Sequence, residues 1–159
     1  MPAHDPLREH LVQLLEGGNA HAKLDQAVRG FPVARAGERP QGAPYSAWEL
    51  LEHMRIAQND ILRFCQSADY QSPEWPAGYW PRSPAPESES QWRDAIAAFR
   101  RDLDEFLGMV NNPKADLYAK IQWGDGQTLL REALLIADHN AYHLGQLILV
   151  RRLLGAWKQ

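Results

Sequence analysis

The sequence predicts an all-α fold built from four principal helices. Apolar residues recur at steps of three and four along four long segments, which is the spacing of one helix face. No segment alternates apolar and polar residues as a half-buried strand does. The chain has 159 residues, 45% of them hydrophobic, which is enough for one domain with its own core. We therefore expect a single helical-bundle domain over residues 1–159.

The first helical segment is expected over residues 6–28, with an interruption in its middle. Gly17 and Gly18 fall there, and paired glycines weaken a helix interior because they leave the backbone unusually free. The pattern fits either one bent helix or two short ones. The stretch 31–44 that follows is rich in Gly, Pro and Arg, which is typical of a loop.

The second helix is expected over residues 46–66. Ser46 and Glu49 form a capping box, in which each side chain accepts a hydrogen bond from the other's backbone N–H. His53 lies at the edge of the apolar stripe of this helix. The stripe consists of Ala47, Leu50, Met54, Ala57, Ile61 and Phe64.

The segment 67–86 contains too many prolines to hold a helix, yet it is more aromatic than a solvated linker. We expect it to pack against the bundle, or alternatively to form a lid through Trp75, Tyr79 and Trp80.

The remaining two helices are expected over residues 88–110 and 128–154. Ser88 and Gln91 form a second capping-box pattern, and Gly155 is well placed to end the last helix. The last helix is apolar on more than one side, as expected for a helix that is buried centrally or lies at an interface. For this reason we expect a homodimer.

Composition argues against several classes of partner. The net charge is −3 and the basic residues form no stripe, so a nucleic-acid partner is not expected. No stretch approaches the roughly 20 apolar residues of a membrane span, and no secretory signal is recognisable, so we expect a cytoplasmic protein with no membrane partner. Cys65 is the single cysteine and lies in a helical apolar pattern, so we expect an inert core thiol.

Histidines carry the strongest chemical signal. His139 and His143 are four residues apart, so they share one helix face, and that face is apolar. Two imidazoles buried there need partners for their nitrogens, and a divalent cation or ordinary hydrogen bonds would both provide them. His53 is the natural third ligand. Asn140 follows His139, so the glutamate of the H-E-x-x-H proteases is missing and protease chemistry is disfavoured.

Four segments, taken together and in order, resemble the DinB-like superfamily, and specifically a bacterial branch of it. They are GGNAHA, SAWELLEHMRIAQNDIL, WGDGQTLLREALLIA and DHNAYHLGQLILVRRLLGAW. The resemblance covers nearly the whole chain. It implies a four-helix bundle with long crossover connections and a three-histidine metal site, whose ligands match His53, His139 and His143.

The resemblance also implies a function. The resemblance to the characterised thiol-transferases and thiol-dependent isomerases of the superfamily implies that the metal activates a low-molecular-weight thiol, so a small-molecule substrate and thiol transfer are expected here. Hydrolysis of a small substrate, or metal and ligand binding without turnover in stress physiology, remain open alternatives. Zn or Ni is the expected divalent metal, with Fe and Mn also compatible with imidazole ligands. No residue is identified as catalytic.

Two further residues are candidates for contacts with a bound cofactor or substrate. His21 belongs to the GGNAHA segment and is expected either to line the pocket or to pair with Asp25 on the surface. Gln146 lies one turn beyond His143 and is expected either to hold a bound water or to contact another helix.

Overall fold

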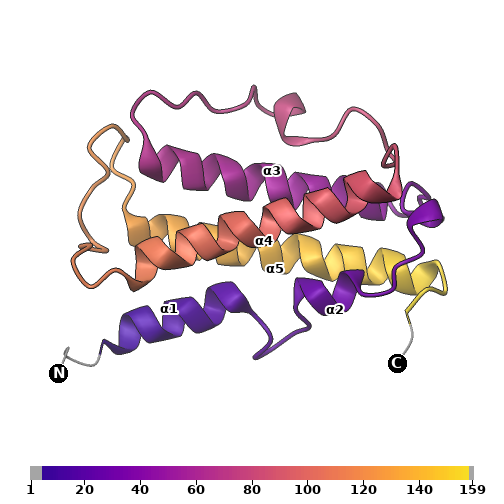
Figure 1. The fold of residues 1–159 in the computed structure, drawn as a ribbon, viewed down its shortest axis with the longest axis horizontal. Coiled ribbons are helices and arrows are strands. Elements are labelled where there is room, and N and C mark those ends of the chain that lie inside the picture. Colours follow the sequence, from indigo (N-terminus) through magenta and orange to yellow (C-terminus); the bar gives the residue numbers. More distant parts are fainter. Residues whose placement is uncertain (1–4, 158–159) are drawn as a thin grey trace.

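Five α-helices build the part of the fold that the structure describes, and they occupy four positions of a bundle (Figure 1). The computed structural model describes residues 5–157. Two short helices lie end to end and take the place of one long helix. In chain order the helices are α1 (Pro6–Glu16), α2 (Leu24–Val28), α3 (Ala47–Gln66), α4 (Glu89–Asn111) and α5 (Leu129–Leu153). Within residues 5–157 there is no β-strand, only one isolated bridge between Lys120 and Thr128. The predicted all-α class is confirmed.

The break between α1 and α2 lies at the paired glycines. Gly17 has φ +68° and Gly18 has φ +90°, which are conformations that side chains with a Cβ rarely adopt. The chain therefore leaves the first helix at Gly17 and re-enters helix at Leu24. Of the two interpretations that the sequence left open, two short helices is correct.

The order of the helices requires one long crossover. α3 and α4 run in the same direction, while α1, α2 and α5 run in the opposite one (Figure 1). The connection between α3 and α4, residues 67–88, therefore travels back along the whole length of α3. It contains a short 3-10 helix, η2 (Ala77–Tyr79). We call residues 67–88 the crossover.

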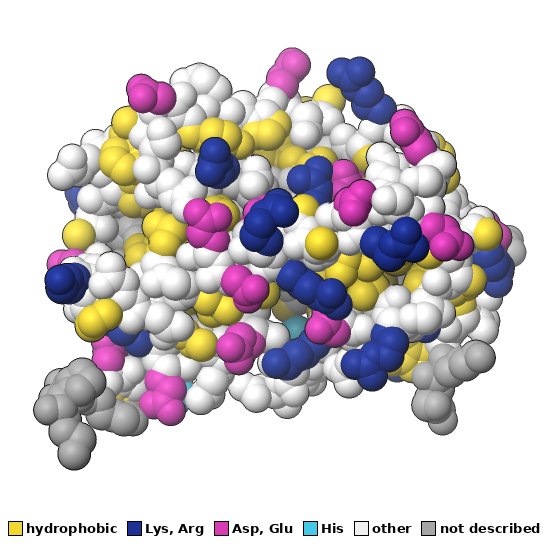
Figure 2. Space-filling model, viewed as in Figure 1, with side chains coloured by type: hydrophobic (Ala, Val, Ile, Leu, Met, Phe, Trp, Pro, Cys, Tyr) yellow, Lys and Arg dark blue, Asp and Glu magenta, His cyan; other side chains and the backbone are white. Residues whose placement is uncertain are grey.

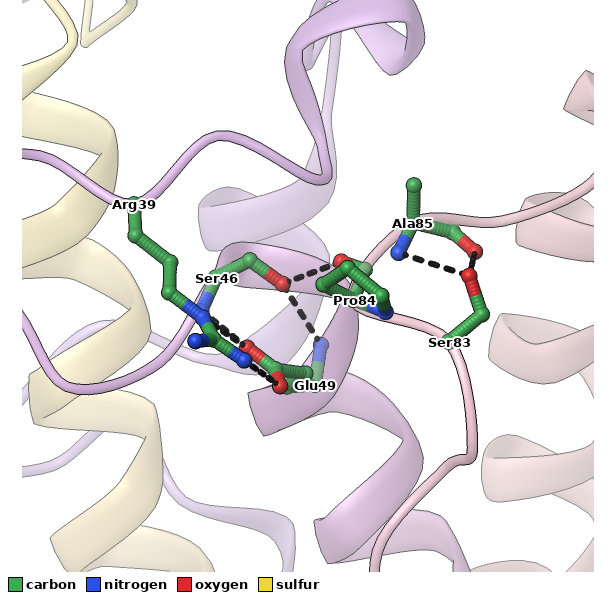
Figure 3. Close-up of polar contacts among 6 residues, drawn as sticks. All are labelled: Arg39, Ser46, Glu49, Ser83, Pro84 and Ala85. Atoms are coloured by element: carbon green, nitrogen blue, oxygen red, sulfur yellow. Dashed lines mark hydrogen bonds and ion pairs between the residues drawn. The ribbon is translucent and has the colours of Figure 1, made fainter.

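The caps locate the helix starts close to where the sequence predicts them. Ser46 Oγ accepts from the N–H of Glu49, and a carboxylate oxygen of Glu49 accepts from the N–H of Ser46, so the capping box of α3 is complete (Figure 3). Ser88 caps α4 through the N–H of Gln91. The Gln91 side chain, however, accepts from the N–H of Glu87 rather than Ser88. The second capping box is therefore only half formed.

Two apolar clusters fill the bundle, one toward each end. α3, α4 and α5 contribute buried residues to both clusters, and Leu103 of α4 packs against both. On α3 the first cluster ends at Met54 and the second begins at Ile61, and on α5 the corresponding stretch lies between Ala137 and Leu144. The three candidate histidines lie at this junction: His53 directly precedes Met54, and His139 and His143 fall within the stretch of α5 between the clusters.

The face shown in Figure 2 has no patch of one charge. Basic side chains (dark blue) are interspersed with acidic ones (magenta) across α4 and its surroundings. No helix within residues 5–157 combines the length and the apolar character that crossing a membrane requires.

Candidate metal centre

Three imidazole rings from two helices meet at the middle of the bundle. The Nε2 atom of His53, on α3, lies 3.1 Å from Nε2 of His143 and 3.1 Å from Nε2 of His139, both on α5. His53 and His143 are buried and His139 is half-buried. Among residues 5–157 this is the one cluster of three or more His, Cys, Asp or Glu residues with metal-binding geometry. The three histidines named from the sequence as candidate ligands therefore lie together in the structure.

Two of the rings have their tautomers fixed by hydrogen-bond acceptors. Nδ1 of His53 lies 2.8 Å from the backbone carbonyl oxygen of Tyr79, which only accepts, so Nδ1 carries the proton. Nδ1 of His143 lies 2.7 Å from Oε1 of Gln146 and donates to it in the same way. In a neutral imidazole the other nitrogen is then a bare lone pair. Both Nε2 atoms therefore point lone pairs into the same small space.

Those lone pairs need a proton or a cation between them. Burial lowers the pKa of all three histidines below the ordinary value, and the neighbouring imidazoles lower the pKa of His53 and His139 further. The pKa of His139 falls to about 4. Protonation is thus disfavoured near neutral pH, while a divalent cation satisfies every lone pair at once.

The spacing also fits a cation. Two metal–nitrogen bonds of about 2.0–2.1 Å at a tetrahedral angle place their nitrogen atoms about 3.3 Å apart. The two Nε2 separations of 3.1 Å at His53 are close to that value. The donor set is nitrogen only and neutral, which suits Zn, Ni, Fe or Mn.

The crossover covers one side of the three rings. Trp80 stacks on His53 with ring centroids 3.9 Å apart and planes inclined by 1°, and Tyr45 stacks on the other face of Trp80 at 4.2 Å. The hydroxyl of Tyr79 donates to Asp60 on α3, so Tyr79 is held at both its main chain and its side chain. The crossover thus orients His53 as well as covering it.

The end of the crossover is fixed to the loop before α3 (Figure 3). Ser46 Oγ donates to the carbonyl oxygen of Pro84, at the same hydroxyl that caps α3. Gly37 lies directly against Ala85, where a Cβ on residue 37 would stand 2.4 Å from the Ala85 Cβ. Glycine is required at position 37 because the two segments approach so closely.

A network of amide side chains lies beside the histidines. Asn140 donates to Oε1 of Gln58 at 2.9 Å, and Gln58 donates to the carbonyl oxygen of Phe99 at 2.8 Å. Asn140 occupies the position where the H-E-x-x-H proteases have glutamate. It here connects α5 to α3 and α4 next to His139.

The other candidate residues have different surroundings. His21 is exposed and is not part of the histidine cluster, and it lies with Asp138 and Ala141 around a hollow of about 460 Å³ between α1 and α5. Its expected surface partner Asp25 instead pairs with Arg100 at 2.6 Å, so that alternative is wrong. Cofactor contacts by His21 and Gln146 stay predictions, although the geometry gives Gln146 a direct contact with His143.

Cys65 is a buried free thiol, and burial together with Glu132 raises its pKa to about 12, as expected for an inert core cysteine.

Sequence reasoning missed three features of the site. It proposed that the aromatic segment packs on the bundle, but not that the Tyr79 carbonyl or the Trp80 ring contacts His53. Trp75, which was grouped with them, is 77% exposed. Asp60 received no role although it lies two helical turns after His53 on the same face of α3. The spacing of two helical turns between His53 and Asp60 was the sequence signal that could have identified Asp60.

The comparison with protein families agrees with the fold. Residues 18–147 match the family model of the DinB superfamily, which spans every helix from α2 to α4 and most of α5, including all three histidines. No curated protein and no solved structure gave a match. Because the family model covers well over half of the sequence, this chain belongs to the DinB superfamily.

Proposed function

We propose that the protein binds one divalent metal ion through His53, His139 and His143 and uses it to activate a small thiol for transfer to an electrophile. The observation that carries the proposal is the convergence of three Nε2 atoms while two Nδ1 atoms are occupied by acceptors. A divalent cation held by three neutral imidazoles keeps its full double charge and lowers the pKa of a thiol or water bound beside it.

The residues around the histidines suit such a centre. Tyr79 and Gln146 hold His53 and His143 with Nε2 unprotonated, as ligands must be. No fourth His, Cys, Asp or Glu joins the three histidines in the described part of the chain, which leaves coordination positions for a small molecule. Trp80 covers one side of His53 and limits access of water from that direction.

Elemental analysis of protein purified without an affinity tag tests the metal. We expect one equivalent of Zn, Ni, Fe or Mn in the native chain and none in His139→Ala, because two imidazoles hold a divalent ion much more weakly than three. Alanine preserves the helix, so circular dichroism should not change. The matched control is His10→Ala on α1, an exposed histidine, which should keep the metal. Stoichiometric metal in His139→Ala would refute the site.

A thiol panel with an electrophilic test substrate examines the activity. The Co- or Ni-loaded protein should develop sulfur-to-metal charge-transfer bands when the right thiol is added, and product should form only with that thiol. A rate that does not depend on thiol would indicate hydrolysis instead. A metal-loaded protein that is inert with thiols and hydrolysable substrates alike would leave metal binding as its function.

A further inference from the structure

A partly apolar, solvent-exposed face runs along α5 on the side away from α3. It consists of Leu134, Asp138, Ala141, Gly145, Leu149 and Arg152, which follow one another at steps of three and four residues. We call these six residues the α5 face. Leu134 is 47% exposed and Leu149 is 56% exposed, and the adjoining Tyr142 and Leu153 are 64% and 55% exposed. Large side chains of this kind gathered on one helix indicate an interaction surface.

Gly145, at the centre of the α5 face, is not explained by any contact among residues 5–157. A glycine in a helix interior costs about 1 kcal/mol relative to alanine. A Cβ at position 145 would meet no neighbouring group of residues 5–157 within 4 Å, so nothing in the described fold requires its absence. A glycine at such an open position is explained if another backbone approaches it closely.

The α5 face is complementary to itself about Gly145. Asp138 and Arg152 lie seven residues before and after it, and Ala141 and Leu149 lie four residues before and after it. In an antiparallel pair of α5 helices that cross at Gly145, Asp138 of each copy therefore faces Arg152 of the other. Leu149 of each copy likewise packs beside the smaller Ala141 of the other.

The charges are available for this pairing. Asp138 makes no ion pair with any residue between 5 and 157, and its side chain is exposed. Arg152 is also exposed, and its guanidinium lies 5.4 Å from the ring centroid of Trp157, a contact that keeps the charge. A heterologous partner would not account for opposite charges placed symmetrically about one glycine.

We propose that two copies of this chain form a symmetric dimer through antiparallel α5 helices that cross at Gly145. The dimer does not depend on the proposed metal chemistry. It has a consequence for the site, because Tyr142 adjoins the α5 face and its ring lies edge-on to His143 at 4.8 Å. Pairing therefore covers the solvent side of Tyr142, next to the histidines.

Charge reversal tests the pairing with its own control. Asp138→Arg places two arginines opposite each other at both symmetric contacts, and Arg152→Asp places two aspartates there. Each change should raise the dimer dissociation constant about tenfold or more in sedimentation velocity. The double variant Asp138→Arg/Arg152→Asp restores opposite charges and should recover most of the affinity. Unchanged mass in both single variants would overturn the proposal, as would a double variant no better than either single one.

Cysteine cross-linking tests the crossing point independently. Gly145→Cys places a thiol on the symmetry axis and should give a disulfide-linked dimer under mild oxidation, since nothing in the described fold crowds that position. The matched control is Ala97→Cys on the exposed side of α4, which should stay unlinked. The native Cys65 is buried and does not interfere. A native chain that is monomeric at tens of micromolar would rule out this interface, as would a Gly145→Cys variant that cross-links no faster than the Ala97→Cys variant.

Discussion

Gln146 acts on the site through a single atom. Its Oε1 accepts from Nδ1 of His143 at 2.7 Å, which fixes both the tautomer and the orientation of that ring. Acceptors of this kind typically contribute tenfold to a hundredfold to metal affinity. They do so without touching the ion.

We therefore expect Gln146→Leu to weaken metal binding by about tenfold to a hundredfold, because His143 loses the acceptor that keeps its Nε2 unprotonated. Gln146→Glu keeps an acceptor at the same place and should bind metal at least as well as the native chain. Competition with a chromophoric chelator measures both values. Equal affinity of the Leu variant and the native chain would show that the contact has no role in binding.

The candidate metal ligands could be predicted from the sequence, whereas the groups that accept hydrogen bonds from their rings could not. His139 and His143 were predictable because four residues make about one helical turn, and His53 because it borders an apolar stripe. The Tyr79 carbonyl was not predictable, because every residue has one and its position depends on the path of the crossover. The Gln146 contact depends on a choice of rotamer that spacing does not determine.

At the scale of the elements, a single side chain from another helix binds the end of α2. Arg151 on α5 is buried and donates to the carbonyl oxygens of Ala27 and Arg29 at 2.6 and 2.7 Å, where α2 ends. It also donates to the carbonyl oxygen of Ala156 at 2.9 Å. One guanidinium thus donates hydrogen bonds to carbonyl oxygens at the end of α2 and in the turn after α5.

Arg151→Met should lower the free energy of unfolding by about 3 kcal/mol, because it removes several charge-assisted hydrogen bonds and leaves buried carbonyl groups without donors. Urea denaturation followed by circular dichroism measures the change. Arg93→Met, on the exposed side of α4, is the control and should change stability by less than about 0.5 kcal/mol. A similarly small effect at Arg151 would contradict this account of α2.

Helix boundaries could be predicted wherever local chemistry determines them. Ser46, Ser88 and Thr128 each cap the helix that follows, and Gly155, with φ +66°, lies just beyond the end of α5. The sequence could not decide whether the first segment bends or breaks, because paired glycines permit both. The route of the crossover has no periodic signal, since contacts such as Tyr79 with Asp60 and Ser46 with Pro84 determine it.

At the scale of the whole molecule, the buried histidines make stability depend on pH. All three have a pKa below the ordinary value when folded, and that of His139 is about 4. As pH falls below about 6.5 the unfolded chain takes up protons that the folded chain does not, so unfolding becomes more favourable. The stability contributed by these groups is complete above that pH and is lost progressively toward pH 4.

The metal-free protein should therefore show a melting temperature that declines between about pH 6.5 and 4, beyond the decline of a His139→Ala variant over the same range. Bound metal should add stability near neutral pH, and that increment should vanish on acidification because protons compete for the same nitrogens. Thermal scans at several pH values, with and without chelator, measure both effects. A chelator-treated protein that melts at one temperature throughout this range would contradict the buried, neutral state of the histidines.

The stacking of Trp80 on His53 gives the molecule a built-in optical reporter. Of the six tryptophans in the chain, Trp80 is the one whose ring lies parallel to a candidate ligand, at 3.9 Å within the described residues. A paramagnetic ion such as Ni or Co bound at that ligand would quench its emission, whereas Zn would not. Because Trp80 belongs to the crossover, its emission also depends on how this segment packs on the bundle. One fluorescence titration on the native chain therefore follows both ion uptake and the seating of the segment that covers the ion.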